Sequence, residues 1–203
     1  SFLCRRRLPL SFSLFFLRQR QMCLSDRMMR SIESLIKLDL AFSILCLRHK
    51  YHRPMVRLSR AISHTGDGHL YAVVGLLAFL FGGEQGKTLL VVGLLAFSIE
   101  LPVYWLAKNT FKRERPSEIS QLIVSFITPP DRYSLPSGHS AAAFLMALHI
   151  SHFYPQLTPF AFTWAALIAF SRVVLGVHFL SDIVLGAVLG LGCTIVSLGI
   201  AGG

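Results

Sequence analysis

Five apolar segments follow one another between residues 66 and 201, and they constrain the fold more than any other feature of this sequence. They lie at residues 69–83, 88–107, 140–154, 157–176 and 182–201. A helix needs about 20 apolar residues to cross the hydrocarbon core of a bilayer, and several of these segments approach that length. Because a spanning helix satisfies its own backbone hydrogen bonds in lipid, we expect an all-α, polytopic membrane helical bundle with five spans.

The composition agrees with a membrane protein. Hydrophobic residues make up 53% of the chain and the mean hydropathy is +0.58, which is too apolar for an ordinary soluble domain. The 20 Lys and Arg residues outnumber the 10 Asp and Glu residues, but they lie between the apolar segments. This placement favours contact with anionic lipid or phosphate over contact with nucleic acid. The four cysteines are too far apart for a metal-ligand motif or a disulfide framework.

The N-terminal part of the chain has a different character. Residues 1–37 are rich in basic residues, and we expect this region to be either disordered or non-native sequence, followed by one membrane-embedded domain over residues 38–203. Residues 35–47 are apolar in patches but are interrupted by Lys37 and Asp39. This stretch is short for a span, so it either lies in the membrane interface or forms a thin, tilted sixth span.

One long link, residues 108–139, separates the second apolar segment from the third. The four charged residues at 112–115 would each cost about 2.5 to 3.5 kcal/mol at the centre of a bilayer, so the link lies at or outside the lipid headgroups. If the spans alternate in direction, the end of the segment at 157–176 returns to the same face. The polar residues of the link and those that follow residue 171 are therefore expected on one side of the membrane.

Three groups of residues on that face point to phosphate chemistry. They are Lys108 with Arg115 and Pro116, then Pro136-Ser137-Gly138-His139, and then Arg172 with His178 and Asp182. Arg115 and Arg172 offer planar forks for a phosphate and Lys108 adds a compact charge, so the oxygens of a phosphoryl group can be neutralised without a metal ion. The backbone N–H groups of Ser137 and Gly138 precede an apolar run, and the start of a helix favours an anion.

The two histidines divide the chemistry between them. His178 and Asp182 are four residues apart, so they share a face if this segment is helical, and the carboxylate can orient the imidazole and stabilise its cationic form. That arrangement is typical of an activated nucleophile. His139 is then available to protonate the departing oxygen as a general acid.

The spacing of these residues resembles the type 2 phosphatidic acid phosphatase family. The family pattern is Lys-x6-Arg-Pro, then Pro-Ser-Gly-His, then Ser-Arg-x5-His-x3-Asp, and this chain matches all three parts in order. A Gly66-Asp67-Gly68 sequence before the first span is similar to small bacterial members. The resemblance implies a phosphohistidine at His178 and acid catalysis by His139. It also implies phosphate binding by Lys108, Arg115, Ser137, Gly138 and Arg172.

The resemblance further implies a membrane lipid phosphatase that needs no cofactor or metal. Its substrate would be a lipid phosphate or diphosphate, with undecaprenyl diphosphate, phosphatidylglycerophosphate and phosphatidate as candidates. The active site would lie on the periplasmic or outer face of the cell membrane. The oligomeric state is left open by the sequence.

Two other functions compete with this reading. Vanadium haloperoxidases share the same constellation, but they are mainly soluble, and the five apolar segments argue against that class. A non-catalytic transporter or scaffold would use the cationic pocket for binding or proton relay.

Three ionisable residues lie within apolar segments and outside the motifs. His149 and His152 are expected to be packing residues, away from the site. Glu100 lies about 12 Å along a helix from Lys108, at a depth where an unpaired charge is costly. We therefore expect Glu100 to be either protonated or hydrogen-bonded.

Overall fold

The computed structural model describes residues 36–46, 52–120, 123–129 and 131–202. Its labelled helices, in chain order, are α2 (His52–His64), α3 (His69–Phe81), α4 (Gly83–Phe111), α5 (Pro116–Ile119), α6 (Gly138–Phe153), the short 3-10 helix η1 (Pro155–Leu157), α7 (Thr158–Val174) and α8 (Leu180–Ala201). Residues 36–46 are also helical. The described residues contain no strand, which confirms the all-α class for this part of the chain.

The expectation for residues 1–37 falls almost entirely on residues 1–35, which lie outside the described residues. It stays a prediction, as does the placement of residues 35–47. The helix at 36–46 is about 17 Å long by the rise of an α-helix, which is short for a span.

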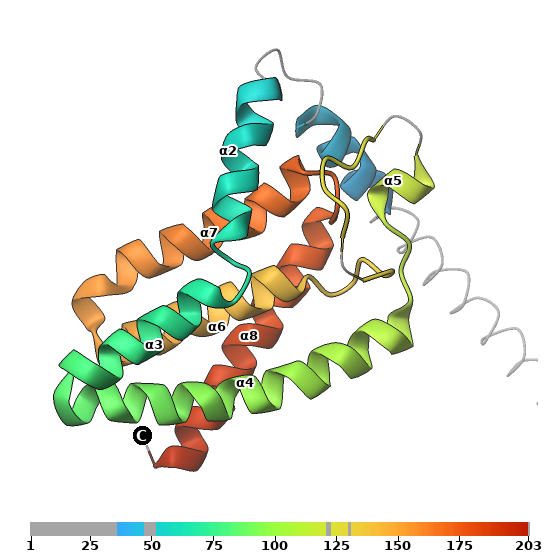
Figure 1. The fold of residues 1–203 in the computed structure, drawn as a ribbon. Coiled ribbons are helices and arrows are strands. Elements are labelled where there is room, and N and C mark those ends of the chain that lie inside the picture. The colour runs from blue at the N-terminus through green and yellow to red at the C-terminus, as the bar shows by residue number, and fades with distance from the viewer. Residues whose placement is uncertain (1–35, 47–51, 121–122, 130, 203) are drawn as a thin grey trace, which may run out of the picture. The chain divides into compact units, whose positions relative to one another are not determined.

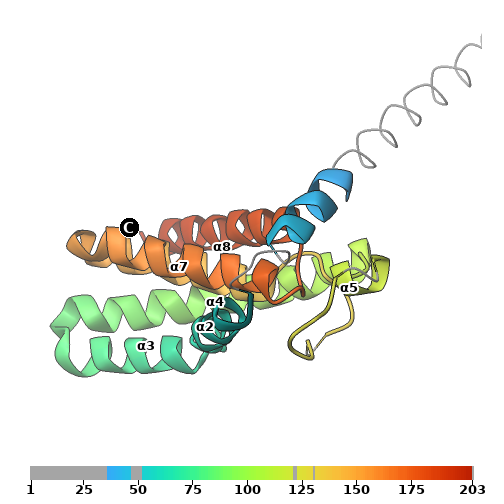
Figure 2. The same ribbon diagram turned by 90° about the horizontal axis from the view of Figure 1, so that it is seen from above.

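Helix α6 is the central helix of the bundle. It packs against α8, α7 and α4, while α3 lies along α4 and α2 contacts α7 (Figure 1). Figure 2 shows the same bundle from above, with α3 beside α4 and α7 beside α8. Three helices therefore pack around α6, which begins at the Pro-Ser-Gly-His sequence.

Two glycines bring α8 unusually close to α6. A Cβ atom on Gly186 would lie 2.4 Å from the carbonyl oxygen of Ser137, and one on Gly190 would lie 2.0 Å from that of Ala141. No side chain fits at these distances, so the two backbones touch. Further along, the Thr194 hydroxyl donates a hydrogen bond to the carbonyl of Leu145 over 3.1 Å. This packing holds the start of α8, with Asp182, beside the start of α6.

Three helical stretches are long and apolar enough to cross a membrane. They are Gly83–Ile119, Pro155–Val174 and Leu180–Ala201. Large apolar side chains on these stretches are exposed, among them Leu94, Trp105, Phe160, Val188 and Ile195. Exposed apolar surface of this extent is typical of contact with lipid.

Helices occur at all five predicted segments, but the count of five spans is not confirmed. Helices α3 and α6 have 13 and 16 residues, which is short of the usual spanning length. The predicted segments at their positions were defined by hydropathy, which does not show where a helix ends.

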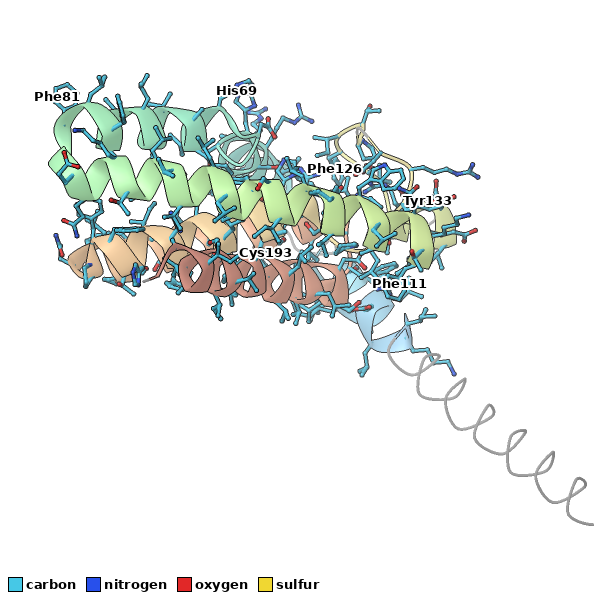
Figure 3. The ribbon with its side chains drawn as sticks, turned by 90° about the horizontal axis from the view of Figure 1, so that it is seen from below. His69, Phe81, Phe111, Phe126, Tyr133 and Cys193 are labelled. Carbon is cyan, nitrogen blue, oxygen red and sulfur yellow. The ribbon has the colours of Figure 1, made fainter. Side chains whose placement is uncertain are left out.

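The long link lies at one end of the bundle. Figure 3 shows Phe111, at the C-terminal end of α4, and Tyr133 of the link at one end, with Phe81 at the opposite end. The motif residues lie at the C-terminal ends of α4 and α7 and at the N-terminal ends of α6 and α8. The tertiary structure therefore gathers the three motifs in one place.

Candidate active site

A pocket of about 620 Å³ opens at this end of the bundle and runs between α3, α4 and α6. Five of the eight predicted site residues line it, namely Lys108, Gly138, His139, Arg172 and His178. The other three, Arg115, Ser137 and Asp182, do not line the pocket but adjoin residues that do.

His178 is almost completely buried and faces Asp182. Its Nδ1 atom lies 3.7 Å from Oδ2 of Asp182, which is longer than a hydrogen bond, and has no hydrogen-bond partner among the described residues. Burial lowers the pKa of His178 to about 4, against the opposing effect of Asp182. The imidazole is therefore neutral at pH 7. Since Nδ1 faces the carboxylate, Nε2 is the nitrogen available to attack a group in the pocket.

Arg113 holds Asp182 in place, although it is not one of the site residues predicted from the sequence. The Nη1 atom of Arg113 donates to Oδ1 of Asp182 over 2.8 Å, and the backbone N–H of Phe179 donates to Oδ2 over 2.8 Å. The Arg113 guanidinium also lies over the Phe179 ring, 4.4 Å from its centroid. In the sequence, Arg113 is one of several charged residues at a membrane edge, and no spacing rule distinguishes it.

Arg113→Ala is expected to lower kcat by about tenfold or more with a small change in KM, because Asp182 loses one of the two donors that fix its position behind His178. Arg113→Lys keeps the charge and is expected to recover part of the activity. Steady-state kinetics of the purified variants measure both effects. The control is Lys112→Asn, an exposed neighbour at which asparagine tolerates the positive φ of 47°. Equal losses in Arg113→Ala and Lys112→Asn would contradict a positioning role.

His139 is oriented by Asp67, from the Gly66-Asp67-Gly68 sequence between α2 and α3. The Nε2 atom of His139 lies 2.7 Å from Oδ1 of Asp67, and Nδ1 of His64 lies 2.6 Å from Oδ2. Burial raises the pKa of Asp67, but the hydrogen bonds to both histidines outweigh burial, so its pKa lies below the usual range. In the sequence, only the family resemblance pointed to Asp67.

The protonation of His139 depends on what the pocket holds. Burial and the charge of Arg172 lower the pKa of His139, although Asp67 opposes them. A phosphate dianion in the pocket adds negative charge beside the ring, which favours the cationic imidazolium. His139 can therefore become protonated when the substrate binds, as a general acid must be.

Asp131, another residue that the sequence reading did not select, lies between two of the predicted phosphate-binding cations. Its carboxylate accepts hydrogen bonds from Nζ of Lys108 and from Nη2 of Arg115. Burial raises the pKa of Asp131, but hydrogen bonds from Lys108 and Tyr104 and the two positive charges outweigh burial, so its pKa lies below the usual range. An anion already occupies the space between these cations, and a phosphate must compete with it.

The two arginines of the motifs have different surroundings. Arg172, in the last turn of α7, lines the pocket, and its Nη1 donates to Oγ of Ser63 over 2.7 Å. Arg115 donates to the carbonyls of Val177 over 2.7 Å and of Tyr133 over 3.1 Å. Arg115 therefore ties the long link to the loop that carries His178, in addition to its ion pair with Asp131.

Ser137 and Gly138 shape the start of α6. Ser137 is the N-cap residue, its Oγ accepts from the N–H of Ser140 over 3.4 Å, and its own N–H donates to the carbonyl of Asp182 over 3.1 Å. A Cβ on Gly138 would lie 3.1 Å from the ring of Tyr104, so glycine allows this close approach. The N–H groups of Gly138 and His139 belong to the first turn, which has no earlier carbonyl to bind and favours an anion.

The two histidines expected to be packing residues differ in position. His152 is exposed, whereas His149 is fully buried at the inner end of the pocket that holds the site residues. The Nε2 atom of His149 donates to the carbonyl of Leu89 over 3.0 Å, which gives this residue a structural role. Because His149 lines the pocket beside Gly93, it is not as separate from the site as its sequence position indicated.

The match to a family model decides the family. Residues 86–202 match the model of the PAP2 superfamily, which is more than half of the chain. This chain belongs to the PAP2 superfamily. The match confirms the resemblance drawn from the motifs, and together with relatives that are named phosphatases it identifies the protein as a phosphatase.

Known relatives and solved structures agree with this assignment. Decaprenylphosphoryl-5-phosphoribose phosphatase of Mycobacterium tuberculosis is 28% identical over 137 residues, which cover 67% of this chain and 75% of that protein. The crystal structure of LpxE from Aquifex aeolicus is similar with a TM-score of 0.65 at 28% identity, covering 80% of this chain and 95% of that one. A transmembrane PAP2-type phosphatidylglycerolphosphate phosphatase from Bacillus subtilis has the same fold, with a TM-score of 0.64 at 24% identity and 96% coverage of both chains.

Proposed function

We propose that this PAP2 protein removes a phosphate from a lipid phosphate or diphosphate at the membrane surface through a phosphohistidine intermediate. The observation that carries the proposal is a single pocket with polar, charged residues at one end and an apolar interior. At its outer end His139, Arg172 and His178 converge, and from there it continues between the apolar helices α3, α4 and α6. A phosphate attached to a lipid fits such a pocket better than a soluble phosphate ester does.

In the first step, the lone pair on Nε2 of His178 attacks phosphorus. The bond between phosphorus and the lipid oxygen breaks, its electron pair stays on that oxygen, and His139 donates a proton to it. The His178 ring becomes positively charged and is stabilised by Asp182, while the cations offset charge on the phosphoryl oxygens. Lys108 contributes fully once phosphate replaces the Asp131 carboxylate.

In the second step, water attacks the phosphorus of the phosphohistidine. The bond between phosphorus and Nε2 breaks, and its electron pair returns to His178. His139, now neutral, accepts a proton from the water. The products are inorganic phosphate and a lipid that has lost one phosphoryl group, so the cycle needs no cofactor.

Candidate substrates come from the family and from the named relatives. They are undecaprenyl diphosphate, phosphatidylglycerophosphate, phosphatidate and decaprenylphosphoryl-5-phosphoribose. We place the site on the periplasmic or outer face of the cell membrane, as the family resemblance implies. A transporter or scaffold with the same pocket would bind these lipids without releasing phosphate.

The test is phosphate release by purified, detergent-solubilised protein from this panel of lipids, with and without EDTA. We expect release from at least one lipid and full activity in EDTA, because Lys108, Arg115 and Arg172 supply positive charge around the phosphate. The described residues also contain no group of three His, Cys, Asp or Glu suited to a metal ion. Vanadate, which resembles the transition state, should inhibit. A strict magnesium requirement would contradict the metal-independent mechanism.

A further inference from the structure

The pocket continues well beyond the phosphate site. Along α4 its lining extends from Lys108 to Leu89, about 28 Å of helix at 1.5 Å per residue. The inner wall is mostly apolar and includes Phe97 and Met146. A pocket of this depth takes in the hydrophobic part of a lipid as well as its phosphate.

Glu100 is the acidic residue in this apolar part of the pocket. It is only 2% exposed and lines the pocket, yet it forms no hydrogen bond or ion pair with any of the described residues. An isolated carboxylate is unfavourable in such surroundings, so burial favours the protonated side chain, which offers one O–H donor and one acceptor oxygen. A buried polar group without a partner in a binding pocket indicates that the partner belongs to the ligand.

The depth of Glu100 indicates which part of the ligand it meets. The close contact between Gly138 and the Tyr104 ring places Tyr104 level with the start of α6, where the phosphate is expected. Glu100 lies one turn further in on the same face of α4, about 6 Å by helix rise. Its partner therefore lies only a few bonds from phosphorus.

Lipid phosphates differ in what they carry at this distance. Lipids built on glycerol or on a sugar have an acyl carbonyl or a hydroxyl there, whereas a polyprenyl phosphate has only hydrocarbon. A second phosphate at this depth would meet a carboxyl group instead of a cation. The protonated carboxyl can donate to a carbonyl or exchange hydrogen bonds with a hydroxyl.

Resting on the proposed function, we propose that Glu100 binds an oxygen-bearing group next to the phosphate, an acyl carbonyl or a sugar hydroxyl. The enzyme then selects lipid phosphates that have such a polar linker over plain polyprenyl phosphates. Glu100 acts as a specificity-determining residue and takes no part in the transfer of the phosphoryl group.

Two matched substrate pairs test this inference. The first pair is ester-linked phosphatidate and its ether-linked analogue, which lacks only the carbonyl oxygens. The second pair is a polyprenyl phosphate and a polyprenylphosphoryl sugar phosphate, which adds hydroxyl groups. We expect wild-type kcat/KM to favour the oxygen-bearing member of at least one pair by about tenfold, as a hydrogen bond in an apolar pocket provides. The pair that shows the preference identifies the carbonyl or the hydroxyl.

Glu100→Leu is expected to remove that preference, mainly by raising KM for the oxygen-bearing substrate. Glu100→Gln keeps the size, a donor and an acceptor, so it should retain most of the preference. It shows whether the loss in Glu100→Leu comes from the hydrogen bond and not from misfolding. Ser98→Ala, on the exposed side of α4, is the control and should behave as wild type. If Glu100→Leu leaves both ratios unchanged, or if wild type shows no preference in either pair, the inference is overturned. Absence of phosphate release from all four lipids would instead overturn the proposed function along with it.

Discussion

His178→Ala is expected to abolish turnover of lipid phosphates, with a loss of about 10⁴-fold or more. It should also abolish the trapping of an acid-labile phosphoenzyme. The physical reason is that Nε2 of the neutral, buried imidazole supplies the electron pair that bonds to phosphorus, and no other described side chain in the pocket has this arrangement with Asp182. Rapid quench with a labelled lipid phosphate, followed by mass spectrometry, measures both the intermediate and its position.

Two further variants make this experiment specific. Asp182→Asn keeps the shape of the side chain but loses its charge, so its rate should lie between wild type and His178→Ala. His152→Ala removes an exposed histidine near the end of α6 and should keep near-normal activity. Phosphate on any residue other than His178, or undiminished turnover in His178→Ala, would overturn the mechanism.

His139→Ala is expected to slow hydrolysis of a lipid phosphate by about 10² to 10⁴-fold, the usual contribution of a general acid. Binding of vanadate should persist, because His178 and the cations remain. The loss should be much smaller with p-nitrophenyl phosphate, whose leaving oxygen needs no proton. Comparing kcat for the two substrates, and vanadate inhibition of both proteins, measures this difference.

The dependence on the leaving group separates acid catalysis from binding. Asp67→Asn should reproduce a weaker form of the same pattern, since Asp67 orients the His139 ring through the 2.7 Å contact. Equal losses of kcat with both substrates, together with loss of vanadate inhibition, would show that His139 binds phosphate and does not protonate the leaving group.

The amino-acid sequence was sufficient to place the apolar helices and to group the motifs. The apolar segments at 88–107 and 182–201 predicted α4 and α8, because long apolar runs are stable in lipid only as helices. Motif spacing and the alternation of helices also predicted that Lys108, His139 and His178 would share one end of the bundle, and they line one pocket.

The ends of the helices were less predictable. Helix α4 continues past Lys108 to Phe111, because lysine is a good helix former and a charge ends an apolar run without ending the helix. The short lengths of α3 and α6 likewise could not be read from hydropathy, which marks apolar residues and not the points where a helix ends.

Only the tertiary structure determined how the catalytic groups are oriented. Arg113 and Asp182 are 69 residues apart, Asp67 and His139 are 72 apart, and Lys108 and Asp131 are 23 apart. Each pair forms because helix packing brings together charged groups that are far apart in the sequence, and no local pattern in the chain encodes such a contact. The same packing turns Glu100 toward the pocket, where it has no hydrogen-bond partner among the described residues.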